Sequence, residues 1–227
     1  MKELQKQIIQ VLAERFAPYG FVKRSGNCFT RDISKNVWQR MEFPSSYYHP
    51  GVKAIYPRIA VGYKDEFNLE RKYFDLHWPF PNYTYNTFYT MLLNIVRTDD
   101  LCWRFRKKED IIPQIDDMTQ AIVKKAIPYM DYISDRKNLI AEMESGFIYS
   151  KMEVWCYRGL PIAYYLEGRK DLALWRLNYY IQKFEKELSG HMKEDENSNF
   201  TRGARNELQD YLEFAEKLKK VMETESR

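Results

Sequence analysis

The sequence predicts an α+β fold, in which one helix precedes an antiparallel sheet of four or five strands and the C-terminal half is helical. Three observations predict this class. Apolar side chains recur at helical spacing over the first 17 residues. Residues 20–78 contain short segments of alternating apolar and polar side chains, and turn-forming residues separate them. From Asp110 onward the apolar period changes to about 3.6 residues, the period of an α-helix.

The first helix is predicted over residues 3–17, and Pro18 and Gly20 end it. Its apolar stripe consists of Leu4, Ile8, Val11, Leu12 and Phe16. Two short strands then flank residues 25–27 (Ser-Gly-Asn), a turn whose residues tolerate positive φ. We therefore expect a hairpin directly after the helix.

Three further strands are predicted over residues 37–43, 56–64 and 72–78, because apolar and polar side chains alternate there. Asp65 and Glu66 belong to the polar connection between the last two. Short connections of this kind favour an antiparallel, meandering sheet.

Six helical segments are predicted after residue 86, from apolar side chains at helical spacing. They cover residues 87–97, 110–128, 135–145, 161–167, 170–188 and 202–223. Ser134 is the expected N-cap of the third segment, and a polar linker, residues 190–199, precedes the last. We expect one continuous domain, in which a helical region (residues 107–227) packs on the helix and sheet of residues 1–106.

The order of a helix, the hairpin GFVKRSGNCFTRD and the strand VWQRMEF resembles the bacterial domain-of-unknown-function family 4304. The matching residues are Gly20, Phe21, Lys23, Gly26, Phe29, Arg31, Trp38 and Gln39. The resemblance covers the first two thirds of the chain, with the aromatic loop at residues 78–85 as an insertion. It implies a fold and no mechanism, because the family has no established activity. Residues 163–173 also resemble the turn of a tetratricopeptide helix pair, which implies two antiparallel helices.

The charge pattern argues against a nucleic-acid binder. The chain carries 36 Lys and Arg against 32 Asp and Glu, a net charge of +4, and the two signs are mixed along its length. The densest basic run, residues 104–108, is followed at once by Glu109 and Asp110. Nucleic-acid-binding domains usually gather positive charge on one face. RNA binding through aromatic side chains beside Arg and Lys stays an alternative.

The sequence lacks the motifs of several enzyme classes. The sequence contains no glycine-rich phosphate loop, no HExxH zinc motif and no GxSxG nucleophile turn. Its cysteines, Cys28, Cys102 and Cys156, form no CxxC pair and lie among apolar neighbours, so we expect buried, unreactive thiols. We assign no catalytic residue and expect no cofactor and no bound metal. No segment holds the roughly 18 apolar residues that span a bilayer, so we expect a cytoplasmic protein without membrane contact.

One group of polar and aromatic side chains gathers on the predicted sheet. The alternation places seven residues on the face opposite the apolar one: Trp38, Arg40, Glu42, Arg58, Tyr73, Asp75 and His77. Ala60 and Gly62 would leave a shallow floor between them. Such a face could hold an anionic ligand on two arginines, with a carboxylate or His77 as proton carrier. The alternative is a face whose charges pair across strands, in solvent or beneath the C-terminal helices.

Two aromatic loops form a second candidate surface, at residues 47–49 and 78–85. Exposed rings on loops often contact a partner protein, but they equally often fold back over a sheet edge. We expect a non-enzymatic accessory or interaction protein that holds its partner with the sheet face and these loops. Proteins of this size and kind also occur as immunity or phage-defence components, which is an argument from analogy alone. An enzyme acting on a phosphate- or carboxylate-bearing substrate is the alternative, and homo-oligomer formation stays open.

Overall fold

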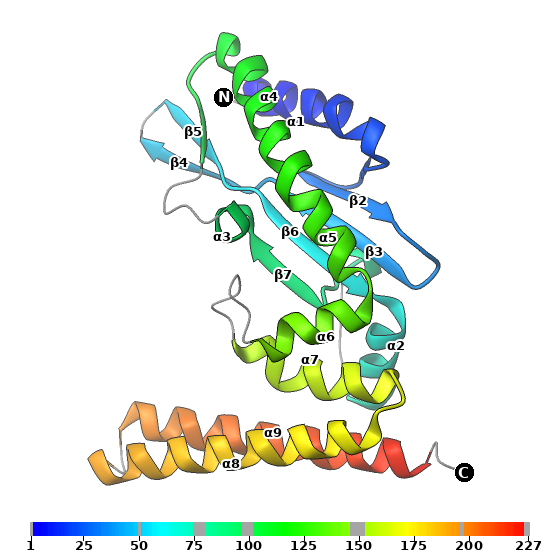
Figure 1. Ribbon diagram of the computed structural model, residues 1–227. Coiled ribbons are helices and arrows are strands. Elements are labelled where there is room, and N and C mark those ends of the chain that lie inside the picture. The colour runs from blue at the N-terminus through cyan, green and yellow to red at the C-terminus, as the bar shows by residue number, and fades with distance from the viewer. Residues whose placement is uncertain are drawn as a thin grey trace. The chain divides into compact units, whose positions relative to one another are not determined.

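The computed structural model describes residues 2–49, 51–74, 80–96, 102–145, 153–195 and 198–224. An N-terminal helix, antiparallel sheets and a helical C-terminal half confirm the predicted α+β class (Figure 1). The chain divides into two compact units, one formed by residues 1–64 and 79–151 and the other by residues 65–78 and 152–227. The predicted boundary at residue 106 falls inside the first unit.

The first unit is built on an antiparallel sheet with the strand order β1-β2-β3-β6-β7. Its strands are β1 (Val22–Lys23), β2 (Cys28–Asp32), β3 (Val37–Glu42), β6 (Arg58–Tyr63) and β7 (Phe88–Met91). The predicted hairpin is formed by β1 and β2, and the predicted strands at residues 37–43 and 56–64 are β3 and β6. These three predictions are confirmed.

Strand β7 corrects the prediction of a helix over residues 87–97. Phe88 and Thr90 are buried and alternate with the half-buried Tyr89 and Met91, which is the pattern of a strand. The strand pairs with β6, and the helix that follows it, α3, covers only Leu92–Val96. Pairing with a distant strand overrides a local apolar spacing that would also fit a helix.

A second, three-stranded sheet of the first unit has the order β4-β5-β8. It consists of β4 (Ser45–His49), β5 (Val52–Ile55) and β8 (Trp103–Phe105). The predicted aromatic loop at residues 47–49 is therefore wrong, because these residues belong to β4. Strand β5 is buried from Lys53 to Ile55, and its partner β8 comes from a part of the chain about 50 residues away.

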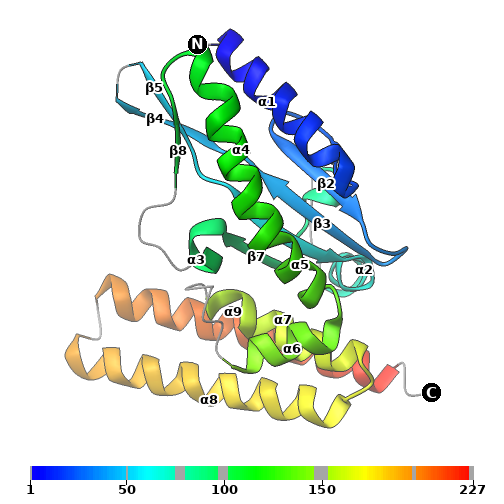
Figure 2. The same cartoon turned by 45° about the horizontal axis from the view of Figure 1, so that its top comes forward.

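Three helices lie over one face of the larger sheet: α1 (Lys2–Phe16), α4 (Ile111–Ala121) and α5 (Ile127–Ile133) (Figure 2). The ring of Phe16 packs against those of Phe29 and Phe43, at centroid distances of 6.5 and 5.7 Å. The hydroxyl of Tyr63 donates to the carbonyl of Ile133 at 2.7 Å. This face is the core of the first unit, and the candidate site lies on the opposite face.

The helix predicted over residues 110–128 changes pitch near its end. A π-helical turn, residues 122–126, joins α4 to α5, and Pro128 lies in the first turn of α5. Proline has no N–H to donate and its ring would clash with the carbonyl four residues earlier, so the wider turn relieves the conflict. Helix α6 (Arg136–Glu144) follows, and its N-cap is Asp135 rather than the predicted Ser134. The 3₁₀ turns of the unit are residues 17–19, 82–84 and 108–110.

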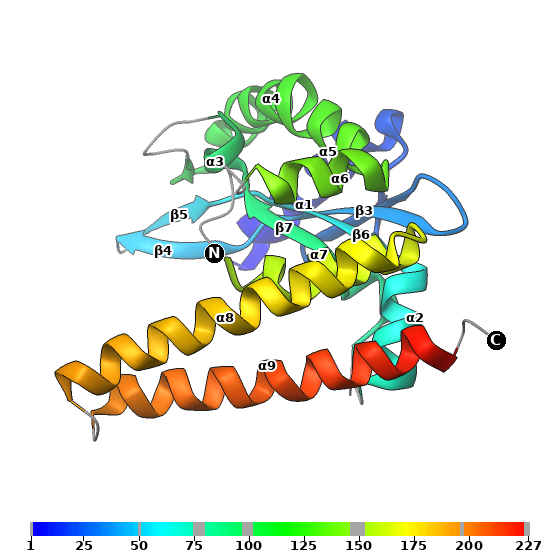
Figure 3. The same ribbon diagram turned by 60° about the horizontal axis from the view of Figure 1, so that its bottom comes forward.

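The second unit is helical. It consists of α2 (Lys64–Tyr73, whose first residue belongs to the first unit), α7 (Glu153–Leu166), α8 (Lys170–Glu194) and α9 (Asn199–Thr224). Helices α7 and α8 form the predicted antiparallel pair around Gly168, whose φ of 74° suits a residue without Cβ. Helices α8 and α9 lie side by side (Figure 3), and Tyr211 packs on Phe184 with ring centroids 5.2 Å apart. Because α8 continues through Glu194, the linker predicted over residues 190–199 is mostly helix.

Helix α2 replaces the predicted polar connection after residue 64. Two acidic residues lie in its first turn and two basic residues in its last, which complements the helix dipole. Glu66, Phe67 and Leu69 are buried. The strand predicted over residues 72–78 is therefore wrong for residues 72–74, and residues 75–78 lie outside the described residues.

Candidate functional site

The register of β3 and β6 places four of the predicted site residues on one face. Arg58 lies opposite Glu42, while Arg40 and Trp38 lie opposite Ala60 and Gly62. Because directly opposed residues in a sheet point to the same side, the four side chains share the face away from α1, α4 and α5. We call this group, Trp38, Arg40, Glu42 and Arg58, the arginine face.

Five further side chains lie on the same side of the sheet, from the neighbouring strands. On β2, Cys28 lies opposite Glu42, Thr30 opposite Arg40 and Asp32 opposite Trp38. On β7, Tyr89 lies opposite Ala60 and Met91 opposite Arg58. Sequence reasoning missed them, because their position on this face depends on strand pairing. The alternation within residues 28–31 could have indicated Cys28 and Thr30, whereas Tyr89 was hidden by the incorrect helix prediction.

The indole of Trp38 closes one end of the arginine face. A Cβ built on Gly62 would lie 2.4 Å from Cε2 of Trp38, so the ring lies directly over this glycine. Trp38 is only 9% exposed. The shallow floor predicted at Gly62 is therefore filled by the indole, which is a correction to the sequence interpretation.

Arg40 is the most deeply buried charged group of the arginine face, with 4% of its surface exposed. Its Nη1 donates to the carbonyl of Thr84 at 2.5 Å, and its Nη2 lies 3.5 Å from Oε1 of Glu42. Its Nε is buried and has no hydrogen-bond partner. The buried guanidinium is thus held in place by one short bond and one long contact, while a third donor is unused.

The 3₁₀ turn at residues 82–84 lies against β3 and supplies the carbonyl that Arg40 uses. Its Tyr83 hydroxyl is 3.2 Å from Oγ of Ser25, and the guanidinium of Arg24 lies 5.8 Å from the Tyr83 ring centroid. The described part of the predicted loop 78–85 therefore folds back on the sheet. Residues 47–49, the other predicted loop, belong to strand β4.

Glu42, Arg58 and Tyr89 form the open end of the arginine face. All three are half-buried, and the guanidinium of Arg58 lies 5.7 Å from the Tyr89 ring centroid. Burial raises the pKa of the Tyr89 hydroxyl, and the positive charges of Arg58 and Arg40 act in the opposite direction. The Nε of Arg58 is buried without a hydrogen-bond partner.

Three buried N–H donors of the arginine face thus lack an acceptor: Nε1 of Trp38, Nε of Arg40 and Nε of Arg58. Buried donors are nearly always paired, and an unpaired one costs about 1–3 kcal/mol or more when charged. The four residues that define the face carry two guanidinium groups and one carboxylate, and Asp32, opposite Trp38, adds a second carboxylate that is exposed. The buried part of the face therefore has more hydrogen-bond donors than acceptors.

Nucleophilic chemistry has little support at this face. Burial raises the pKa of the Cys28 thiol to about 11, although the charges of Arg40 and Arg24 oppose the shift. Thiolate, the nucleophilic form, is therefore scarce at neutral pH. Asp75 and His77 lie outside the described residues. Tyr73 ends helix α2 in the second unit and lines a cleft there.

The described residues contain no group of three or more His, Cys, Asp or Glu side chains that could hold a metal ion. Within the same residues, no helix combines the length and the apolar character needed to cross a bilayer. Comparisons with protein-family models, with curated proteins and with solved structures found no match to this chain. The resemblance to family 4304 therefore stays a prediction from the residues alone.

Proposed function

We propose that the protein is a non-enzymatic binding module whose first unit holds an anionic group of its partner, a carboxylate or a phosphate, on the arginine face. The observation that supports this proposal most strongly is the set of three buried N–H donors without acceptors on Trp38, Arg40 and Arg58. A carboxylate or phosphate oxygen is the acceptor that two guanidinium groups bind best.

The charge of the first unit supports the same proposal. It carries 21 Lys and Arg against 14 Asp and Glu, whereas the second unit is slightly acidic. The net positive charge attracts an anion before contact. Because Trp38 and Arg40 are nearly buried, only a small group can reach them, and it enters beside Glu42, Arg58 and Tyr89.

The binding role is favoured over the enzymatic alternative by the state of the side chains. Cys28 is protonated at neutral pH, and the carboxylate of Glu42 already lies 3.5 Å from Nη2 of Arg40. We further propose a cytoplasmic location, which the free, buried thiol of Cys28 supports.

The test uses inorganic phosphate as the probe and the full chain as the protein. We expect phosphate to raise the melting temperature, and native mass spectrometry of the protein as purified to show a bound small anion. The variant Arg58→Gln should weaken phosphate binding by about tenfold or more, since a hydrogen bond to a charged group contributes about 1.5–3 kcal/mol.

The matched control is Arg106→Gln, which removes an exposed arginine of the same unit. It should leave phosphate binding unchanged. Equal loss of phosphate binding in both variants would mean that only the net charge of the protein matters, and would overturn the proposal. A melting temperature indifferent to phosphate, together with a protein free of bound anion, would overturn it as well.

A further inference from the structure

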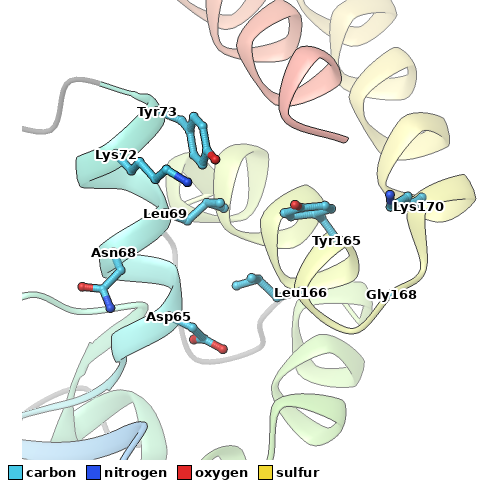
Figure 4. A pocket seen from close by; sticks show the side chains of 9 residues that line it. All are labelled: Asp65, Asn68, Leu69, Lys72, Tyr73, Tyr165, Leu166, Gly168 and Lys170. Atoms are coloured by element: carbon cyan, nitrogen blue, oxygen red, sulfur yellow. The ribbon is translucent and has the colours of Figure 1, made fainter. Parts of the chain in front are cut away.

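The second unit contains a cleft of about 410 Å³ between helix α2 and the turn that joins α7 to α8. Figure 4 shows Asp65, Leu69 and Lys72 along the side of α2 that faces Tyr165 and Leu166. Clefts of about 300–1,000 Å³ are the usual size for small-molecule sites. All residues that line this cleft belong to the second unit, so it is independent of the arginine face.

The middle of the cleft is apolar. Leu69 and Tyr165 are 8% and 7% exposed, and Leu166 of α7 is half-buried beside them. On α2, positions 65, 69 and 72 fall on one helical face, so the same side of the helix presents an acidic, an apolar and a basic residue in order. A flat apolar ligand body would contact these walls.

Two ammonium groups reach the cleft from opposite walls (Figure 4). Lys72 of α2 lies with its Nζ 4.4 Å from the ring centroid of Tyr73, which also lines the cleft. Lys170 of α8 donates from its Nζ to the carbonyl of Met222 at 3.1 Å, which fixes the position of its charge.

Asp65 is the one carboxylate among the residues that line the cleft, and its position orients a ligand. It lies seven residues before Lys72, about 10 Å along the helix axis. A bound anion is favoured near the two lysines and disfavoured near Asp65. The carboxylate of Asp65, which accepts a hydrogen bond from the backbone N–H of Glu66 at 2.8 Å, would instead suit a donor group of a ligand.

From this arrangement we infer that the cleft binds an aromatic organic anion, with its ring against Leu69, Leu166 and Tyr165 and its charge between Lys72 and Lys170. Two sources share this chemistry, an aromatic carboxylate and a nucleoside monophosphate. The site is separate from the proposed anion site of the first unit, and either can fail without the other.

The test measures binding of 1-naphthoate and of adenosine 5′-monophosphate to the full chain by titration calorimetry, with 1-naphthalenemethanol and adenosine as uncharged counterparts. Methyl NMR of Leu69 and Leu166 locates the bound probe. We expect saturable binding of at least one anion, with shifts at both leucines. Its uncharged counterpart should bind at least about threefold more weakly than the anion, a difference typical of an exposed ion pair. Which anion binds distinguishes the two sources.

Two variants decide the assignment. Lys72→Gln should remove the preference for the anion over its uncharged counterpart, while Lys186→Gln, an exposed lysine of α8 outside the cleft, should retain it. Leu166→Glu, at a half-buried position, should lower the affinity of both anions at least as much as Lys72→Gln. Absence of saturable binding by both anions, leucine methyls that do not shift, or a preference that survives Lys72→Gln would each overturn the inference. Loss of binding on Arg58→Gln would place the probe on the arginine face and overturn it too.

Discussion

Gly62 lies directly beneath the indole of Trp38, so closely that a Cβ at position 62 would be 2.4 Å from Cε2 and 2.6 Å from Nε1 of that ring. The two residues are paired across β3 and β6. Since the sheet fixes both backbones, the close approach sets the position of the indole and thereby the closed end of the arginine face.

We expect Gly62→Ala to destabilise the protein by about 1–3 kcal/mol, because the added methyl group must displace a nearly buried ring. Chemical unfolding monitored by circular dichroism measures the change. Gly203→Ala in α9 is the control, since a Cβ there meets no atom within 4 Å and alanine favours a helix. A Gly62→Ala variant as stable as the wild type would show that the indole moves freely.

Stability at alkaline pH should depend on Cys28. Burial raises the pKa of its thiol from 9.0 to about 11. The folded protein therefore holds the proton that the unfolded chain releases, so this contribution is complete below pH 9 and is lost as the pH rises toward 11. Two pKa units correspond to about 2–3 kcal/mol.

The measurement is the free energy of unfolding of the wild type and Cys28→Ala between pH 8 and pH 11, because 9.0 and about 11 bound the titration. We expect a flatter pH dependence for Cys28→Ala. Identical slopes for the wild type and Cys28→Ala would contradict the assignment.

The arginine face shows which part of a site a sequence can predict. Period-two alternation in residues 37–43 and 56–64 was enough to place Trp38, Arg40, Glu42 and Arg58 on one side, because a strand has only two sides. It could not reveal that Trp38 lies over Gly62, since this depends on which residues of two strands are opposed.

The failures have a common physical cause. Residues 87–97 and 72–78 each carry a spacing that fits both a helix and a strand, and tertiary pairing decides between them. Residues Phe88–Met91 pair with β6 and therefore form a strand. Residues 72 and 73 instead form the last turn of α2. Tyr73 is consequently not part of the arginine face, whereas Tyr89, which was not predicted there, lies on it.

Lys53 should reduce stability at neutral pH. It is 3% exposed on β5 and its ammonium donates to Oε1 of Gln5, while burial lowers its pKa. A pKa below the unfolded value means that the folded state disfavours the charge, so this cost is present at neutral pH and disappears as the pH approaches 10.5. Lys53→Met should therefore stabilise the protein by about 1 kcal/mol.

Thermal unfolding at pH 7 and at pH 10 checks this expectation, because the gain should be larger at the lower pH. Lys35→Met, at an exposed lysine of the same unit, should change the melting temperature little at either pH. A destabilised Lys53→Met would mean that the bond to Gln5 outweighs the cost of burying the charge.

Substitution of Arg40 can show whether the arginine face is a ligand site or a structural ion pair. Its nearly buried guanidinium makes one short hydrogen bond to Thr84, and its contact with Glu42 is 3.5 Å long. Such bonding does not repay the desolvation of a charge, and replacing a poorly paired buried charge by an apolar side chain is often neutral or stabilising. We expect Arg40→Met to be within about 1 kcal/mol of the wild type without phosphate.

The two proteins should diverge when inorganic phosphate is added. Phosphate should raise the melting temperature of the wild type, because a ligand that binds only the folded state stabilises it, and should leave Arg40→Met unchanged. If Arg40→Met instead unfolds far more easily in the absence of phosphate, Arg40 holds the 3₁₀ turn at residues 82–84 on the sheet and its role is structural. The unpaired Nε would then be a cost of that role rather than a place for a ligand.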